Sequence, residues 1–538
     1  MTARVRPALL PHARPLAVLA ALVPLVVSSL ATPLVTLSQS EPTLVDRNLE
    51  VDTHVAGLEL PTSIAFLGSD DLLVLEKNSG EVKRVSRGEV QTVLDLAVNN
   101  ASERGLLGIA LHPDFPDDPG VYLFWTCRSM APQDADPFRP EEQRCSDDAM
   151  TGQPDTDDTL QVPMLGNRVD RFEWTGAALV YDHNLEMLLA FQNDGAPEPP
   201  GQGDDATGPH GPQPARANHD GGILAFGADG KLYVMFGDVG RRGALQNLPC
   251  GPTATECNGP EDITPDDQFG GPQPDDNHFS GVILRLNDDG TTPTDNPLFD
   301  AGAQMGGEAG TNVQRIYAYG IRNSFGMAVD PLSGGLWQQE NGEDAFDEIN
   351  RVEAGMNSGW IQIAGPSTRI GDFRQIETTS LHHEDFPNLQ QFRWGPERIA
   401  TTREDALSRL FRLPGSHYSE PEFSWKFVLA PSAIGFQNGS ALGRQYRGDL
   451  FVGFSTTDTL GGPLFRFNLT GNRRAIGVDD PRLEDRVADN ATFHDMTESE
   501  SLLFGTAFGI VTDIETGPDG NLFVVSLDHG TIYEISRR

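Results

Sequence analysis

The stretch from Gly320 to Trp360 concentrates side chains that could carry out chemistry. Arg322 stands near its start, and five carboxylates follow within nine residues, at positions 340, 343, 344, 347 and 348. Carboxylates interleaved with glycine suit a loop that turns sharply around a ligand, and a guanidinium suits an oxyanion. The alternative is a solvated acidic loop. We predict that this stretch forms the floor of a site.

A second candidate is His219, in the run Asn218-His219-Asp220-Gly221-Gly222 at the entry to a strand-like segment. An imidazole there could work as a general base, and the glycines would let a substrate approach the backbone. A lone histidine can equally be a structural hydrogen-bonding group. We assign that structural role to the other eleven histidines of the chain.

The first 31 residues have the pattern of a secretory signal peptide. Three arginines precede an apolar run from Leu16 to Val27, and Ser29-Leu30-Ala31 offers a small-residue cleavage site. The run is shorter than a membrane-spanning helix requires, and no later segment is long and apolar enough to span. We expect a secreted or periplasmic protein without stable membrane insertion.

The charge of the chain excludes one class of partner. The formal net charge is −39, with 78 acidic residues against 39 basic ones. Nucleic acid is therefore not expected as a ligand, because binding it requires a basic face. The acid excess is compatible with high solubility, with bound cations or with a saline medium, and it does not choose among them.

One pattern recurs six times: a short apolar strand, a turn rich in Asp, Gly or Pro, and a second apolar strand. The copies begin at Ser63, Gly108, Ile223, Gly326, Ala433 and Asp513. Their period of two and their turn residues predict antiparallel β-hairpins. Units of this kind with long inserted loops indicate an all-β fold, a six-bladed β-propeller over residues 42–538. Leu44 to Val55 is expected to share a blade with the final strand, Thr531 to Ile535.

Three insertions are expected in this propeller, at about 127–216, 240–278 and 369–418, and the last is expected to include a short helix. The first two are rich in Asp, Pro and Gly and should be surface loops. Of the three possible connectivities of the four cysteines, the simplest pairs those that are near in sequence. We expect disulfides between Cys250 and Cys257 and between Cys127 and Cys145, as loop staples without a catalytic role.

Five segments together resemble the glucose/sorbosone dehydrogenase family. They are RGLLGIALHPDF (104–115), NHDGGILAFGADGKLYVMFGD (218–238), YGIRNSFGMAVDP (319–331), ENGEDAFDEINRVEAGMNSGW (340–360) and FGIVTDIETGPDGNLFVVS (508–526). The similarity runs from about Leu58 to Ile535. It implies a six-bladed propeller, pyrroloquinoline quinone (PQQ) and calcium as cofactors, a small-molecule sugar substrate, an external electron acceptor, and a monomer or homodimer.

The resemblance also implies roles for particular residues. His219 matches the family's general base, which takes the proton of the sugar C1 hydroxyl as hydride passes to the quinone. Asp347 matches a carboxylate that pairs with and orients that histidine. Arg322 matches the arginine near the quinone oxygens, where a cation stabilises the charge that develops on the reduced cofactor.

Further positions match cofactor and metal contacts in the same way. Glu103, Asp220, Arg322, Asn323 and Asn341 are expected to contact the quinone. The backbone carbonyls of Gly342 and Glu343 are expected to bind calcium, a hard cation that prefers oxygen ligands.

The sequence departs from the family pattern at three places. In the family, a lysine and a pair of arginines late in the chain hold the quinone's carboxylates. They have no counterpart here, because the segments 456–465 and 508–514 contain no basic residue. The family's proline in the calcium loop is Glu343, and the glutamine of an early quinone-contacting motif is Glu103. Fewer cations and more carboxylates should weaken the binding of a tricarboxylate cofactor.

Three functions fit these observations. The first is an exported, calcium-assisted quinoprotein that oxidises an aldose-type sugar at C1. The second is a calcium-dependent propeller lactonase or esterase, which would use the acidic stretch at 340–348 and a histidine without a quinone. The third is a non-catalytic extracellular carbohydrate-binding propeller.

Overall fold

The computed structural model describes residues 41–100, 102–128, 166–188, 219–239, 244–247, 280–379 and 396–538. The predicted signal peptide and most of the first two predicted insertions lie outside these ranges. So do Cys145, Cys250 and Cys257, and both disulfide pairings therefore remain predictions. Cys127 is described and is buried.

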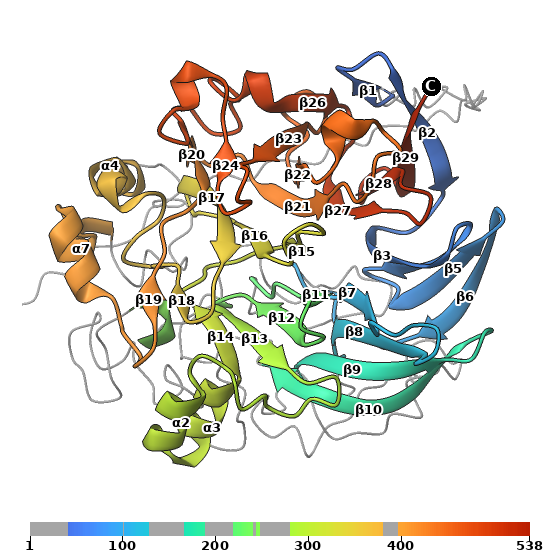
Figure 1. The fold of residues 1–538 in the computed structure, drawn as a ribbon, viewed down its shortest axis with the longest axis horizontal. Helices are drawn as coiled ribbons and strands as arrows, with labels where there is room; N and C mark the ends of the chain where they lie inside the picture. Colours follow the sequence, from blue (N-terminus) through green and yellow to red (C-terminus); the bar gives the residue numbers. More distant parts are fainter. Residues whose placement is uncertain are drawn as a thin grey trace, which may run out of the picture. The chain divides into compact units, whose positions relative to one another are not determined.

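The described strands form six sheets, each built on four consecutive antiparallel neighbours (Figure 1). The first sheet has the order β3 (Pro61–Gly68), β4 (Asp71–Glu76), β5 (Glu81–Ser86) and β6 (Glu89–Asp95). The second has β7 (Leu106–Leu111), β8 (Gly120–Thr126), β9 (Asn167–Trp174) and β10 (Leu179–Leu188). The third has β11 (Ile223–Phe226), β12 (Leu232–Phe236), β13 (Val282–Leu286) and β14 (Ile316–Tyr319), extended by β18 (Met356–Asn357) and β19 (His417–Tyr418).

The remaining three sheets follow the same plan. The fourth has β15 (Met327–Val329), β16 (Leu336–Glu340), β17 (Ala345–Val352), β20 (Phe423–Phe427) and β25 (Val487–Ala488). The fifth has β21 (Pro431–Phe436), β22 (Leu450–Phe454), β23 (Leu464–Leu469), β26 (Leu503–Thr506) and β1 (Thr43–Leu44), with β24 (Ile476–Gly477) beside β23. The sixth has β27 (Val511–Thr516), β28 (Leu522–Ser526), β29 (Thr531–Arg537) and β2 (Leu49–Ala56).

The first strand of each sheet lies at the centre of the arrangement, and each contacts its counterparts in the two neighbouring sheets. This is the arrangement of a β-propeller, and the all-β prediction is confirmed. The six hairpins expected from the repeats are all present as antiparallel pairs, β3–β4, β7–β8, β11–β12, β15–β16, β21–β22 and β27–β28.

The second strand of each sheet is buried at nearly every position, as in β8, β12, β22 and β28. These strands read as continuous apolar runs instead of alternating ones because neighbouring sheets cover both of their faces. Trp125, Trp337 and Trp425, all fully buried, fill spaces in this core.

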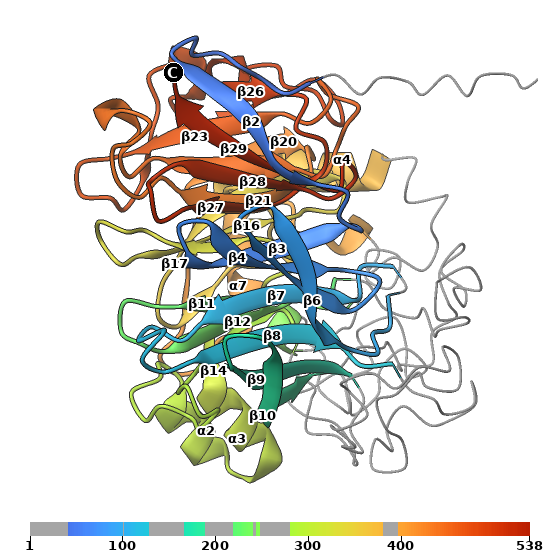
Figure 2. The same ribbon diagram turned by 90° about the vertical axis from the view of Figure 1, so that its right-hand side faces the viewer.

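The chain's first long strand pairs with its last. Strand β2 is antiparallel to β29, with Leu49 opposite Arg537 and Ala56 opposite Thr531. Both views show the two strands side by side (Figures 1 and 2). The prediction that the two ends of the propeller segment share one sheet is confirmed.

In the described ranges, the α-helices lie in connections between strands. They are α2 (Phe299–Met305), α3 (Gly307–Arg315), α4 (Ile370–Thr379) and α7 (Arg403–Arg409). Helices α4 and α7 lie in the third predicted insertion, where a short helix was expected, whereas α2 and α3 had no counterpart in the sequence prediction. Within the described ranges, no helix has the length and apolar character needed to cross a membrane.

Candidate active site

Most of the predicted site residues lie just before the innermost strands. Glu103 precedes β7, His219 precedes β11, and Arg322 and Asn323 precede β15. The backbone N–H of His219 donates to Glu103 Oε2 at 2.5 Å, and Asn323 Nδ2 donates to the same oxygen at 3.3 Å. Segments that are 220 residues apart in the chain therefore meet around one carboxylate.

His219 is buried and carries a carboxylate partner. Its Nδ1 lies 2.7 Å from Oδ1 of Asp238, and Trp360 Nε1 donates to Oδ2 of the same aspartate at 2.8 Å. A carboxylate only accepts hydrogen bonds, so this contact places the imidazole proton on Nδ1 and leaves the Nε2 lone pair available. The backbone φ of His219 is 63°, a left-handed conformation that a non-glycine residue adopts at some cost.

The hairpin β11–β12 explains this pairing. His219 precedes the first strand and Asp238 follows the second, so the antiparallel register that sets Ile223 opposite Met235 also brings these flanking residues together. The backbone N–H of Asp238 in turn donates to the carbonyl of Arg322 at 2.8 Å. The histidine and its partner are thus fixed to the segment that carries the arginine.

Asp347 does not pair with His219, contrary to the sequence prediction. Its carboxylate oxygens accept the backbone N–H groups of Gly342, Leu429 and Ala430, at 2.9, 2.5 and 2.7 Å. Burial raises the pKa of Asp347 to about 6, although these three donors oppose the shift. Asp347 instead ties the 341–345 loop to the segment before β21, and among the described residues Asp238 is the carboxylate bonded to the imidazole of His219.

Arg322 donates hydrogen bonds to three nearby residues at positions 340 to 343. Its backbone N–H donates to Glu340 Oε1 at 2.8 Å, its Nη1 to the carbonyl of Asn341 at 3.2 Å, and its Nη2 to the Glu343 carboxylate. The guanidinium carbon lies 5.5 Å from the ring centre of Trp360, within the range of a cation–π contact. Burial lowers the pKa of Arg322, but nearby Glu343 and Asp238 outweigh it and the net shift is upward.

Asp220 is fully buried beside the neighbouring sheet. Its Oδ1 accepts Asn167 Nδ2 of β9 at 2.9 Å, and its Oδ2 has no hydrogen-bond partner within the described part of the chain. Burial raises the pKa of Asp220 to about 6, and the positive charge of Arg104 opposes the shift. An orphaned carboxylate oxygen in this position is a candidate acceptor for a ligand donor.

Buried carboxyl groups hold the loop predicted to bind calcium. Gly342 donates its N–H to Asp347, while Asp344 and Ala345 both donate theirs to Glu377 Oε1 of α4, each at 3.1 Å. Burial raises the pKa of Glu377 well above its usual value, and the neighbouring acids reinforce the shift. Glu377 had no signal in the sequence, because the hairpin repeats do not place an inserted helix.

Glu340 and Glu348 face each other across β16 and β17. Glu340 Oε2 accepts Ser358 Oγ at 2.9 Å, Glu348 Oε1 accepts the N–H of Gly365 at 2.6 Å, and Asn350 Nδ2 donates to both carboxyl groups. Burial raises the pKa of Glu348 to about 7, and that of Glu340 lies well above its usual value for the same reason. These acids satisfy protein donors, so the density of carboxylates in the sequence is not by itself a metal site.

No group of three His, Cys, Asp or Glu side chains in the described ranges is arranged to hold a metal ion. This does not concern the two backbone carbonyls on which the predicted calcium site depends. Near them, Asn341 donates its Nδ2 to the carbonyl of Pro431 at 2.8 Å, and its Oδ1 is buried without a partner in the described structure.

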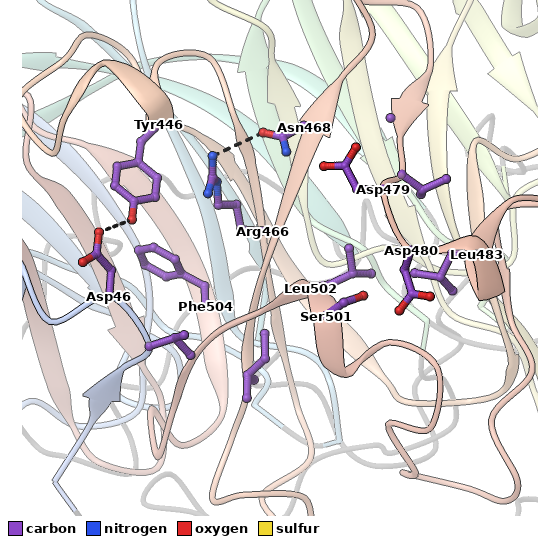
Figure 3. A pocket seen from close by; sticks show the side chains of 14 residues that line it. Asp46, Tyr446, Arg466, Asn468, Asp479, Asp480, Leu483, Ser501, Leu502 and Phe504 are labelled. Carbon is purple, nitrogen blue, oxygen red and sulfur yellow. Dashed lines mark hydrogen bonds between the residues drawn. The ribbon is translucent and has the colours of Figure 1, made fainter.

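Two cavities lie away from these residues. One, of about 290 Å³, is lined by the fifth sheet and its connections; there Tyr446 donates to Asp46 at 2.6 Å and Arg466 to Asn468 at 3.3 Å (Figure 3). The other, of about 340 Å³, is lined by all six innermost strands; most of its lining residues are aliphatic or aromatic, and Asn438, Glu515 and Thr516 add polar groups. Neither cavity contains any of the predicted site residues.

The comparisons with known proteins agree with this architecture. The family model for glucose/sorbosone dehydrogenase matches residues 58–149 and 209–387, just over half of the chain. Quinoprotein glucose dehydrogenase B of Acinetobacter calcoaceticus is 28% identical over 328 residues, which are 59% of this chain and 53% of that protein. Aldose sugar dehydrogenase YliI of Escherichia coli K12 is 24% identical over 328 residues, 61% of this chain and 62% of that protein. The matched region thus spans between about half and two thirds of the length of these curated relatives.

A solved structure supports the fold over nearly the whole chain. The PQQ-bound form of an aldose sugar dehydrogenase from Streptomyces coelicolor superposes with a TM-score of 0.50 at 19% identity, covering 93% of this chain and all of that one. At this identity the likeness concerns the fold alone.

Proposed function

The chain belongs to the glucose/sorbosone dehydrogenase family, and from this membership we propose that it oxidises an aldose-type sugar at C1 with PQQ as the oxidant and calcium as an assisting ion. The observation that carries the proposal is the buried His219–Asp238 pair, fixed beside Arg322. The names of the relatives, a quinoprotein glucose dehydrogenase and aldose sugar dehydrogenases, support the reaction class.

The donor set fits the quinone end of the cofactor. Buried polar atoms of three predicted contact residues have no partner in the described part of the chain: Arg322 Nε, Asn323 Oδ1 and Asn341 Oδ1. Such atoms are costly unless a ligand or water satisfies them. Cations for the cofactor's carboxylates are absent from the segments 456–465 and 508–514. We therefore assign Arg322, Asn323 and Asn341 to the quinone end.

The catalytic step of this chain is a proton transfer at His219. PQQ, when bound, would supply the hydride acceptor for oxidation of the sugar at C1. His219 Nε2 has the free lone pair to take the proton of the C1 hydroxyl, and Asp238 stabilises the imidazolium that forms. Trp360 holds Asp238 through its second oxygen, so the imidazole orientation is fixed before the substrate arrives. Arg322 provides positive charge where negative charge develops.

For calcium, we propose the carbonyl oxygens of Gly342 and Glu343 as ligands. Glu377 and Asp347 hold three N–H groups of the surrounding loop, so its backbone conformation is set without the ion. A preformed carbonyl pair is a suitable partial site for a hard cation that completes its shell with ligand or water oxygens.

We also propose that the propeller has six blades, one for each sheet. The support is the closed circuit of contacts among β3, β7, β11, β15, β21 and β27, together with the pairing of β2 with β29. We further propose export of the protein through the signal at its first 31 residues, and an external electron acceptor. The support for export is the arginine-flanked apolar run from Leu16 to Val27.

The experiment is reconstitution of the purified protein with PQQ and calcium, followed by reduction of an artificial dye with a panel of aldoses. Activity that requires both sugar and quinone is the expected result. Absence of dye reduction with every common aldose at saturating quinone would refute the dehydrogenase activity. Assays with lactones and esters, and a test of sugar binding, would then decide between the hydrolase and the binding module.

A further inference from the structure

Arg322 and Glu343 form an ion pair that is removed from solvent. Glu343 accepts a hydrogen bond from Nη2 of Arg322, and the two side chains are only 9% and 7% exposed. A guanidinium this deeply buried requires a counter-charge. In the structure that counter-charge is supplied by the protein itself.

Glu343 thus occupies one side of the Arg322 guanidinium, the cation on which the proposed chemistry depends. Nη1 of Arg322 is also engaged, by the carbonyl of Asn341 at 3.2 Å, and one face of the guanidinium lies toward Trp360. Nε is the donor left without a partner in the described structure. An acidic or quinoid ligand that approaches Arg322 therefore meets a carboxylate already bound to it.

Three more acidic groups surround this pair. Glu103 and Asp238 lie close enough to Arg322 to raise its pKa together with Glu343, and Asp347 also interacts with its charge. The side chains around the arginine thus carry an excess of negative charge. Glu343 adds to this excess of negative charge, because the family pattern has an uncharged proline at the matching position.

We propose that Glu343 is an internal competitor for Arg322 and sets the affinity of the site for acidic ligands, PQQ among them. This inference rests on the proposed function for the identity of the ligand. The Glu343 carboxylate satisfies Arg322 in the structure, and a ligand oxygen must displace it or share the guanidinium with it. Either event weakens binding, because one anion is separated from its cation or two anions are brought together.

The variant that tests this is Glu343→Gln, which keeps the size and a hydrogen-bond acceptor for Arg322 while removing the charge. PQQ is titrated into the protein at fixed calcium and ionic strength, and binding is followed by tryptophan fluorescence, to which Trp360 beside Arg322 should contribute. We expect Kd to fall by about tenfold or more, since like charges at close range are costly. Asp344→Asn, which removes the same charge one residue along the loop, should change Kd by less than about threefold.

A double-mutant cycle shows whether the effect passes through Arg322. In the Arg322→Ala background, Glu343→Gln should give no gain in affinity. A gain that persists there, or a Kd for Glu343→Gln equal to or above that of the wild type, would overturn the proposal. If Glu343→Gln does not fold, Glu343→Ala is judged by the same criteria.

Binding and turnover separate this proposal from the proposed function. Tight PQQ binding by Glu343→Gln without sugar oxidation by the wild type would support competition by Glu343 for Arg322 and refute the proposed sugar oxidation. Sugar oxidation by the wild type with no change of Kd in Glu343→Gln would refute the competitor and leave the activity standing.

Discussion

The innermost strands carry different chemistry at their two ends. Before β7, β11 and β15 the chain places Glu103, His219 and Arg322, whose polar atoms bond to one another and to buried carboxylates. The middle and far parts of the same strands line a cavity of about 340 Å³ with aliphatic and aromatic side chains. One end keeps several charges that are costly to bury, whereas the other is mostly aliphatic and aromatic, with Glu515 as an acid among its lining residues.

This difference indicates which end is organised for chemistry and which for stability. Substitutions at the polar end should affect turnover more than folding, and those at the apolar end should do the reverse. The substitutions of His219, Asp238 and Phe66 below test that division.

The largest effect is expected for His219→Ala. Loss of the proposed base should reduce turnover by ~10² to 10⁴-fold, while quinone binding, measured by fluorescence titration, should remain close to that of the wild type. Steady-state kinetics of the reconstituted enzyme at several quinone concentrations give both quantities. Undiminished turnover in this variant would show that the base lies elsewhere.

Asp238→Asn should come next, with turnover lowered by about 10²-fold, because an amide does not stabilise an imidazolium as a carboxylate does and can orient the ring wrongly. Asp347→Asn is the matched comparison at the same end. Since Asp347 bonds to backbone N–H groups of Gly342, Leu429 and Ala430, its replacement should lower the melting temperature more than Asp238→Asn does. A larger kinetic loss for Asp347→Asn would restore the pairing first expected from the sequence.

A smaller effect concerns pH and stability. Burial raises the pKa of Glu348 from its ordinary 4.5 to about 7, so the native state holds this proton more tightly than the unfolded chain. The favourable contribution of Glu348 to the free energy of unfolding is therefore complete below about pH 4.5. It is lost as pH rises toward 7, by up to about 1.4 kcal/mol per pH unit. Denaturant unfolding between pH 4.5 and 7 should show a shallower decline for Glu348→Gln than for the wild type. The exposed Glu89→Gln should keep the wild-type slope.

The smallest effect is expected at the apolar end. Phe66 contributes to the central cavity and packs edge-to-face on Phe523, with ring centres 4.8 Å apart. Phe66→Leu should lower the free energy of unfolding by about 1 kcal/mol and leave turnover unchanged. Calorimetry and the dye assay measure the two quantities, and a loss of turnover without a loss of stability would remove the distinction between the two ends.

The fold was largely predictable because it depends on local pairing. Each hairpin joins segments close in sequence, and apolar runs around a turn of Gly, Asp or Pro are enough to specify it. The pairing of His219 with Asp238 was predictable for the same reason, since the two residues flank the hairpin β11–β12, whereas the family resemblance pointed to Asp347. A count of residues across that hairpin would have found the correct partner.

The contacts that escaped prediction are those made between sheets or with inserted helices. Trp360 reaches Asp238 across 122 residues, and Glu377 comes from a helix outside the repeats. The acids at positions 340 and 348 were also expected to face a ligand, whereas they accept hydrogen bonds from the protein. An acidic residue looks the same in a sequence whether it binds a metal, a guanidinium or a backbone N–H, and only the surrounding donors distinguish these cases.

The pairing of β2 with β29 has a consequence for the biosynthesis of the protein. A ribosome releases Leu49–Ala56 long before Thr531–Arg537, so β2 has no native neighbour along this edge until β29 has been synthesised. An unpaired strand can join strands of other nascent chains. Asp52 and His54, in the middle of β2, place polar side chains on this edge, which disfavours such joining. Strand β29 then occupies the position beside β2 that has stayed open.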